Sequence, residues 1–340
     1  MLHGHGDDAY RYGQNFIADF STNVWSGGEP IGLKEHLFRQ WHRIEKYPEV
    51  LGESLAQKVA QHHGVAPGQI LVCNGTTESI YLIAQAFRGK STTIAIPAFA
   101  EYEDACRMHQ HQLEFIEWDD LFALSQLQTD LFFICNPNNP TGSVFLQLAE
   151  LLGKNPETLF ILDEAFIQFT RSLKTAIPLL SQYSNLVILR SMTKAFAIPG
   201  LRLGYIVANE KLINQLKSFK LPWSVNTLAL EAGKYIFDNY EALQLPIRQI
   251  LKAKEDFVTQ LQQQAILKIN ESHTHFFLAQ TNVGTAAQLK QYLISQFGLL
   301  IREAGNFRGL GEKHIRLATL TPDKNQLLLQ ALTQWKIHCS

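Results

Sequence analysis

Cysteine is scarce in this sequence, which has four in 340 residues. They are scattered, and none stands in Cys-x-x-Cys spacing, so neither a disulfide framework nor a cysteine metal site is indicated. The four positions are Cys73, Cys106, Cys135 and Cys339. Three of them lie in apolar segments typical of strands or helices, which favours buried, reduced thiols. A reduced cytoplasmic protein is the simplest interpretation.

An excess of charge of either sign is also absent, because 30 Lys and Arg balance 31 Asp and Glu and the net charge is −1. That balance argues against a surface for nucleic acid or anionic membrane. No apolar run approaches the roughly 20 residues of a membrane helix, and the N-terminus lacks the basic and apolar regions of a signal peptide. No Gly-x-Gly-x-x-Gly follows a strand, which argues against a nicotinamide site, and no ligand-rich cluster indicates a metal.

What the sequence does contain is a regular alternation of helical periodicity and short apolar runs, beginning near residue 52. Apolar strands separated by helices predict a mostly parallel sheet covered on both faces, here a three-layer α/β/α domain with seven strands. The expected strands are Gln69–Cys73, Thr93–Ile96, Leu113–Ile116, Leu131–Cys135, Leu159–Leu162, Leu186–Leu189 and Leu203–Val207.

The pattern changes near residue 224, where long helical segments enclose fewer strands. This predicts a smaller α+β domain. Its expected helices are Leu228–Tyr240, Pro246–Gln262, Ala286–Gln296 and Pro322–Trp335. Its expected strands are Ala265–Ile269, His275–Leu278 and His314–Leu317. We therefore expect a large domain over residues 45–223, with residues 1–44 and 224–340 forming the small domain.

A lysine flanked by hydroxyl groups follows one of the expected strands. Lys194 comes directly after Ser191 and Thr193, and Arg202 lies a little further on. A charge at the end of a buried strand is costly unless it is paired or removed. Such a lysine either reaches solvent or forms a Schiff base with an aldehyde cofactor, whose phosphate the hydroxyls and guanidinium would bind. Taken alone, the motif does not decide between the two.

Other polar residues follow neighbouring strands, where ligands of such sheets bind. Thr76 and Thr77 open a helix whose N–H groups form a phosphate cradle, although capping explains them equally well. Asn139 lies in a Pro- and Gly-fixed turn and can donate into the cleft, or serve the turn alone. Asp163 ends an apolar strand and needs a cationic partner such as a protonated pyridine nitrogen; otherwise it is a helix N-cap or a metal ligand.

Together these segments resemble the fold-type-I pyridoxal-phosphate enzymes, the class I and II aminotransferase family, over nearly the whole chain. The resemblance implies that pyridoxal 5'-phosphate is the cofactor and that Lys194, Asp163 and Tyr102 are catalytic. Lys194 would bind the aldehyde and shuttle protons, and Asp163 would pair with the ring nitrogen. Tyr102, in Phe99-Ala-Glu-Tyr102, would stack on the ring, and Asn139 would bond the ring hydroxyl.

The resemblance also assigns the cofactor phosphate. The residues that would hold it are Thr76, Thr77, Ser191, Thr193 and Arg202. Tyr47, in Lys46-Tyr47-Pro48, matches a tyrosine that reaches the phosphate from the neighbouring subunit. A homodimer with shared sites is therefore expected.

Within the family the chain is most similar to threonine-phosphate decarboxylases of cobalamin biosynthesis, and next to histidinol-phosphate aminotransferases. Strings that carry the similarity are His5-Gly-Asp-Asp8, Asp19-Phe-Ser-Thr-Asn23, Asp163-Glu-Ala-Phe166-Ile and Leu221-Pro-Trp-Ser-Val-Asn226. The resemblance implies that Arg316 grips the substrate α-carboxylate. It also implies that Arg302, His5 and Asn23 take the substrate phosphate, with His3 as the alternative register for His5. As isolated residues, the two arginines could equally form surface ion pairs.

Two activities follow as alternatives. The first is decarboxylation of L-threonine O-3-phosphate to (R)-1-amino-2-propanol phosphate; the second is transamination of a small or phosphorylated amino acid. They differ in which bond at the α-carbon stands perpendicular to the pyridine ring, and sequence does not report torsions. A cofactor-binding regulator is disfavoured, because no DNA-binding segment is appended and Lys194 and Asp163 are both retained.

Overall fold

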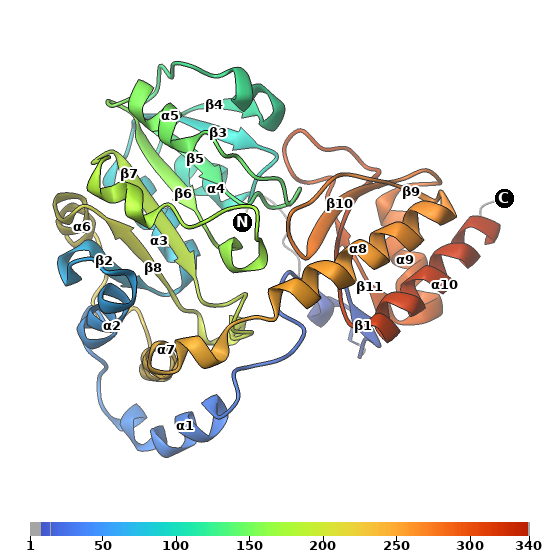
Figure 1. The fold of residues 1–340 in the computed structure, drawn as a ribbon, viewed down its shortest axis with the longest axis horizontal. Helices are drawn as coiled ribbons and strands as arrows, with labels where there is room; N and C mark the ends of the chain where they lie inside the picture. The colour runs from blue at the N-terminus through green and yellow to red at the C-terminus, as the bar shows by residue number, and fades with distance from the viewer. Residues whose placement is uncertain (1–7, 14, 339–340) are drawn as a thin grey trace.

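The computed structural model describes residues 8–13 and 15–338, which fold into two lobes joined along one side (Figure 1). The larger lobe is built on a seven-stranded sheet, and all seven expected strands are confirmed. They are β2 (Ile70–Cys73), β3 (Ser91–Ile96), β4 (Gln112–Glu117), β5 (Leu131–Cys135), β6 (Leu159–Asp163), β7 (Leu186–Ser191) and β8 (Gly204–Ala208). The strand order is β2-β8-β7-β6-β5-β3-β4, and only β8 runs antiparallel to its neighbours.

Helices lie on both sides of this sheet, so that its strands, apart from the edge strand β4, are buried on both faces (Figure 1). This burial is why those six strands are largely apolar rather than alternating. The helices of this lobe are α2 (Glu53–His63), α3 (Gly75–Ala86), α4 (Glu101–Met108), α5 (Leu148–Lys154), α6 (Glu210–Lys217) and α7 (Thr227–Asp238). The prediction of an α/β fold around a mostly parallel seven-stranded sheet is confirmed.

The smaller lobe contains an antiparallel sheet of order β12-β13-β10-β9. Its strands are β9 (Leu267–Ile269), β10 (Phe276–Thr281), β12 (Arg302–Glu303) and β13 (His314–Ala318), and its helices are α8 (Ile247–Gln264), α9 (Ala286–Phe297) and α10 (Pro322–His338). The three strands expected here are present. The two-residue β12 was not expected, because so short a strand has no readable alternation.

The N-terminal segment runs between the lobes. Its strand β1 (Ala18–Asp19) pairs with β11 (Leu299–Leu300) of the smaller lobe. A few residues on, the N–H of Trp25 donates to the carbonyl of Lys194 at 3.0 Å. The residues between these two anchors, including Asn23, are therefore held beside the lysine of the larger lobe.

Two hydrophobic clusters form the interiors. One surrounds the seven-stranded sheet, and the other lies between the small sheet and α8, α9 and α10. Helix α1 (Leu33–Arg39) and α7 pack on each other and into the first cluster, although residues 33–39 and 227–238 fall outside the expected 45–223 boundary. We propose that the two clusters are the cores of two domains. No helix among the described residues is both long and apolar enough to cross a membrane.

Candidate active site

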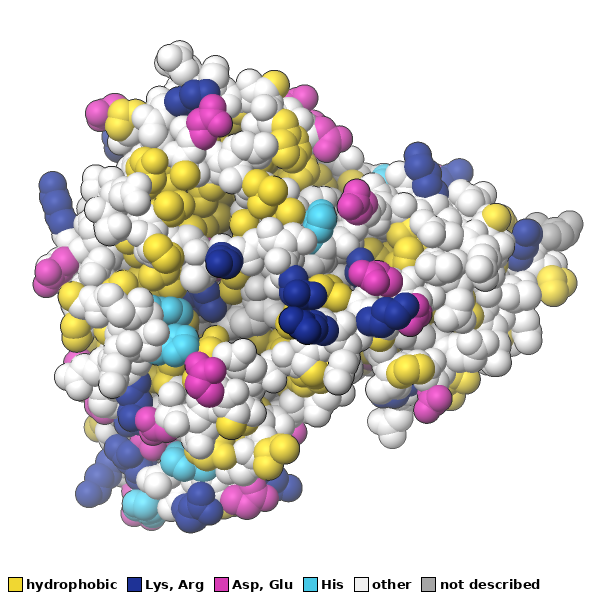
Figure 2. Space-filling view, viewed as in Figure 1, with side chains coloured by type: hydrophobic (Ala, Val, Ile, Leu, Met, Phe, Trp, Pro, Cys, Tyr) yellow, Lys and Arg dark blue, Asp and Glu magenta, His cyan; other side chains and the backbone are white. Residues whose placement is uncertain are grey.

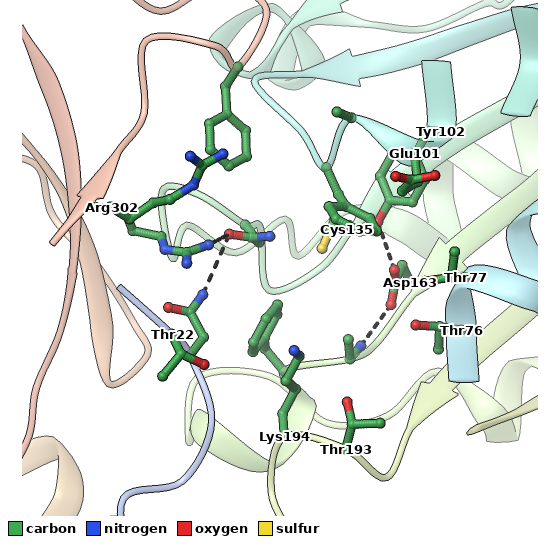
Figure 3. A pocket seen from close by; sticks show the side chains of 18 of the residues that line it. Thr22, Thr76, Thr77, Glu101, Tyr102, Cys135, Asp163, Thr193, Lys194 and Arg302 are labelled. Atoms are coloured by element: carbon green, nitrogen blue, oxygen red, sulfur yellow. Dashed lines mark hydrogen bonds between the residues drawn. The ribbon is translucent and has the colours of Figure 1, made fainter. Parts of the chain in front are cut away.

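The site is a cavity of about 380 Å³ lined by residues of both lobes. Figure 3 shows Lys194, Asp163 and Tyr102 on the side of the larger lobe, with Arg302 facing them from the smaller lobe. Nearly all the described site residues expected from sequence line this cavity. They are Asn23, Thr76, Thr77, Tyr102, Asn139, Asp163, Thr193, Lys194, Arg202, Arg302 and Arg316.

Lys194 is placed by the end of β7. The strand buries Leu186 to Ser191 completely, and the chain then turns, so that Lys194 is only half-buried and faces the cavity. Ser191 does not line the cavity; its hydroxyl lies 2.8 Å from that of Thr193, which does. Ser191 is therefore placed to orient Thr193 from behind.

Asp163 ends β6, the neighbour of β7. Its carboxylate accepts the hydroxyl of Tyr102 at 2.7 Å and the N–H of Ala165 at 2.9 Å. Burial raises the pKa of Asp163 to about 6, because a desolvated carboxylate resists ionisation. A cationic group facing Asp163 would reverse that effect. The ring of Tyr102 also stacks on Phe133, with centroids 5.4 Å apart.

The first turn of α3 forms the third side of the cavity. The helix begins at Gly75 (φ +78°), and a Cβ on Gly75 would lie 2.8 Å from Nη2 of Arg202. Gly204 of β8 approaches the same turn so closely that a Cβ would lie 3.0 Å from the N–H nitrogen of Thr76. The two glycines thus bring a helix N-terminus, the hydroxyls of Thr76 and Thr77, and a guanidinium together. This combination binds phosphate.

Two arginines approach the cavity from the smaller lobe. Arg302 of β12 stands directly opposite Arg316 of β13 in the antiparallel register. Like charges at opposed positions destabilise a sheet unless an anion lies between them. Burial, and then the charge of Arg302, lowers the pKa of Arg316 to about 9. Among the described residues, none accepts a hydrogen bond from the buried Nε of Arg316. The pair is arranged to receive an anionic ligand.

Asn139 links the arginines to the cofactor side. Its Oδ1 accepts from Nη1 of Arg316 at 2.6 Å and from Nδ2 of Asn23 at 3.5 Å. With the amide oxygen used in this way, the NH₂ end is left to donate into the cavity. This orientation agrees with the donor role expected for Asn139.

Besides Ser191, two expected residues need separate mention. Tyr47 is 84% exposed and does not line the site of its own chain. His5, like its alternative His3, lies outside the described residues. Sequence reasoning missed Asn306 and Phe307, which also line the cavity. No motif marks them, although their nearness to Arg302 along the chain was a usable signal.

Comparison with known proteins agrees with this geometry. Residues 18–332 match the family model described as aminotransferase class I and II. The chain belongs to this family. It is 32% identical to the threonine-phosphate decarboxylase of Salmonella typhimurium, over 93% of this chain and 90% of the relative. The histidinol-phosphate aminotransferase of Pyrococcus furiosus is 29% identical, over 91% of this chain and 90% of the relative.

Among solved structures, that of L-threonine-O-3-phosphate decarboxylase from Porphyromonas gingivalis superposes with a TM-score of 0.92 and 40% identity. It covers 94% of this chain and all of the other. The family's cofactor is pyridoxal 5'-phosphate. The residues present fit that group, because Asp163 is a buried carboxylate in need of a cation and the α3 turn is a phosphate cradle. Lys194 lies in the same cavity as both.

Proposed function

We propose that this enzyme decarboxylates L-threonine O-3-phosphate to (R)-1-amino-2-propanol phosphate, a reaction of cobalamin biosynthesis. The observation that carries the proposal is the opposed pair Arg302 and Arg316 in the cavity. Two buried guanidinium groups suit a substrate with two anionic groups, a carboxylate and a phosphate. The relatives named as threonine-phosphate decarboxylases, at 32% and 40% identity, support this assignment.

The cofactor, when bound, would serve as an electron sink for the pair of electrons left at the substrate α-carbon. Asp163 would keep the ring nitrogen protonated, because the carboxylate is buried and the ion pair then replaces its lost hydration. Thr76, Thr77, Thr193 and Arg202 would hold the cofactor phosphate, with Ser191 supporting Thr193. Lys194 would bind the cofactor and move the proton at the α-carbon.

The smaller lobe would orient the substrate. Arg316 would bind the α-carboxylate beside Asn139, and Arg302 would bind the phosphate with Asn23. Holding both ends of the substrate determines which bond at the α-carbon stands perpendicular to the ring, and that bond breaks. His5 remains a proposed contact to the phosphate.

The second candidate is an aminotransferase of the histidinol-phosphate type. The relative from Pyrococcus furiosus, which aligns over 91% of this chain, supports it. One assay distinguishes the two activities. The purified holoenzyme is incubated with threonine phosphate, with and without a 2-oxoacid acceptor. Release of CO₂ without acceptor is the expected result, whereas product formation only with acceptor would assign the enzyme to the aminotransferases.

We also propose a homodimer in which Tyr47 serves the partner's site. Several large apolar side chains are exposed on α1, on the segment that follows it and on the loop between α6 and α7, and such a patch is typical of an interaction surface. They are Phe38, Trp41, Ile44, Tyr47, Leu221 and Trp223. The Tyr47 and Trp223 rings lie 5.1 Å apart and belong to one patch. A second copy of the chain is the proposed occupant.

A cytoplasmic location is part of the same proposal. The three described cysteines, Cys73, Cys106 and Cys135, are buried and free of disulfides, which suits a reducing compartment. On the face shown in Figure 2, side chains of both charge signs are interspersed, with Lys and Arg gathered between the lobes. Fractionation of cells that express the protein at native level would test the location.

A further inference from the structure

Two residues of the loop between β12 and β13 contact the side chain of Arg302. Asn306 accepts from Nη2 of Arg302 at 2.9 Å, and the Phe307 ring centroid lies 5.5 Å from the guanidinium carbon. Ala304 and Phe307 are buried against Leu278 of β10 in a small cluster of their own. The position of Arg302 in the cavity therefore depends on where residues 304–308 lie.

The next residue of this loop crosses to the other lobe. Arg308 donates through Nε and Nη2 to the two carboxylate oxygens of Glu103 on α4, at 2.8 Å and 2.6 Å. Its guanidinium also lies over the ring of Phe115, 4.2 Å from the centroid. Only 8% of the Glu103 side chain is exposed. The hydrogen bonds from Arg308 are the chief reason that the pKa of Glu103 falls to about 2.

This contact is stronger than an ordinary surface ion pair. A planar guanidinium that meets a carboxylate through two bonds fixes both distance and orientation, and here an aromatic face holds the same group from one side. Glu103 adjoins Tyr102 on α4, so the contact joins the helix on the cofactor side to the loop on the substrate side.

We propose that Arg308 and Glu103 are positioning residues that clamp residues 304–308 between the lobes and thereby aim Arg302 at the anionic group of the substrate. The proposal rests on the function proposed above, in which Arg302 binds the substrate phosphate. Neither residue is a catalytic residue, because their contacts run through Asn306 and Phe307 rather than to the reacting atoms.

The chain supplies a matched control on the same carboxylate. Arg107 donates to Oε1 of Glu103 at 2.8 Å, but it lies on α4 itself, so its bond does not cross between the lobes. Arg308→Met and Arg107→Met each remove one guanidinium from Glu103. Only the first breaks the contact between the lobes. Arg308→Lys keeps the charge but loses the two-point geometry.

The test measures binding of inorganic phosphate to the holoenzyme by calorimetry, with the cofactor already filling its own phosphate cradle. Arg302→Met is included to show that the measured phosphate binds at Arg302. We expect Arg308→Met to raise the phosphate dissociation constant about fivefold to tenfold, Arg308→Lys to raise it less, and Arg107→Met to change it less than about twofold. Hydrogen exchange of residues 304–310 should quicken in Arg308→Met, and the visible absorbance of the bound cofactor should not change.

The outcomes separate the two proposals. If Arg302→Met binds phosphate as wild type does, the assignment of Arg302 to the substrate phosphate is wrong, and the clamp is wrong with it. If Arg302→Met weakens binding but Arg308→Met does not, the substrate site stands and the clamp alone is overturned. Equal losses in Arg308→Met and Arg107→Met would also overturn it, because the effect would then come from the charge around Glu103.

Discussion

Asp163 is a residue whose charge the protein alone stabilises poorly. Its carboxylate is almost fully buried and receives only two hydrogen bonds from the described residues, from Tyr102 and Ala165. Burial raises its pKa to about 6, so without the cofactor the charged form opposes folding. The role proposed for Asp163, keeping a ring nitrogen protonated, therefore implies a cost to the stability of the cofactor-free enzyme.

We predict that Asp163→Asn stabilises the cofactor-free protein at neutral pH. In the folded state the pKa of Asp163 lies above its ordinary value, so between about pH 4 and pH 6 the folded protein binds more protons than the unfolded chain does. The free energy of unfolding of the wild-type protein therefore falls as pH rises through that window. At pH 8 the variant should gain about 2–3 kcal/mol in free energy of unfolding, and near pH 4 the gain should vanish. Denaturant unfolding of both apoproteins across this range measures the difference. A gain of the same size at both pH values would show that amide packing, not ionisation, is responsible.

At the scale of elements, the site depends on the contact between β8 and the first turn of α3. A Cβ on Gly204 would lie 2.9 Å from the carbonyl oxygen of Arg190 and 3.1 Å from the carbonyl carbon of Gly75, both backbone atoms. Backbone on two sides cannot give way as a flexible side chain can. The glycine is therefore required by close approach, and strand packing sets the geometry of the turn proposed to hold the cofactor phosphate.

Gly204→Ala should push the α3 turn out of place. We expect the free energy of unfolding to fall by about 1–3 kcal/mol and the cofactor dissociation constant to rise, since the N–H groups at Thr76 move with the turn. Reconstitution of the apoprotein, followed by absorbance, measures the affinity. Gly200→Ala is the control, because no heavy atom lies within 4 Å of a Cβ there. Wild-type cofactor affinity in Gly204→Ala would contradict the cradle geometry.

The larger lobe is predictable from sequence for a physical reason. Strands buried on both faces must be apolar throughout, so they can be recognised in the sequence. The carboxyl ends of parallel strands meet at one edge of the sheet, and residues that follow neighbouring strands, such as Asp163 and Lys194, are therefore predicted to lie close together. The smaller lobe shows the limit. β12 has two residues, and the opposition of Arg302 to Arg316 is a matter of register between distant segments. The Arg308–Glu103 contact lies between a loop and a helix of different lobes, and no local pattern encodes it.

At the scale of the whole molecule, the homodimer proposed above would cover the exposed patch around Tyr47 and bring that side chain to the partner's cofactor phosphate. Tyr47 does not line the cavity of its own chain, and its exposed ring lies 5.1 Å from that of Trp223. In a symmetric dimer the same patch would cover itself, and each Tyr47 would point to the other site. A Tyr47 defect on one chain and a Lys194 defect on the other should then fall in the same site, which leaves the second site of the dimer intact.

Hybrid dimers test this arrangement. Tyr47→Ala and Lys194→Ala are each expected to be nearly inactive, but in a hybrid of the two chains one site carries both defects and the other carries none. Random re-association of equal amounts should therefore restore about a quarter of wild-type activity, since half of the dimers have one intact site. Mixing Lys194→Ala with Asp163→Ala is the control, because both residues act in the cavity of their own chain and every hybrid site keeps one defect. If the Tyr47 mixture stays as inactive as this control, Tyr47 does not reach across to the partner, and the exposed patch has another use.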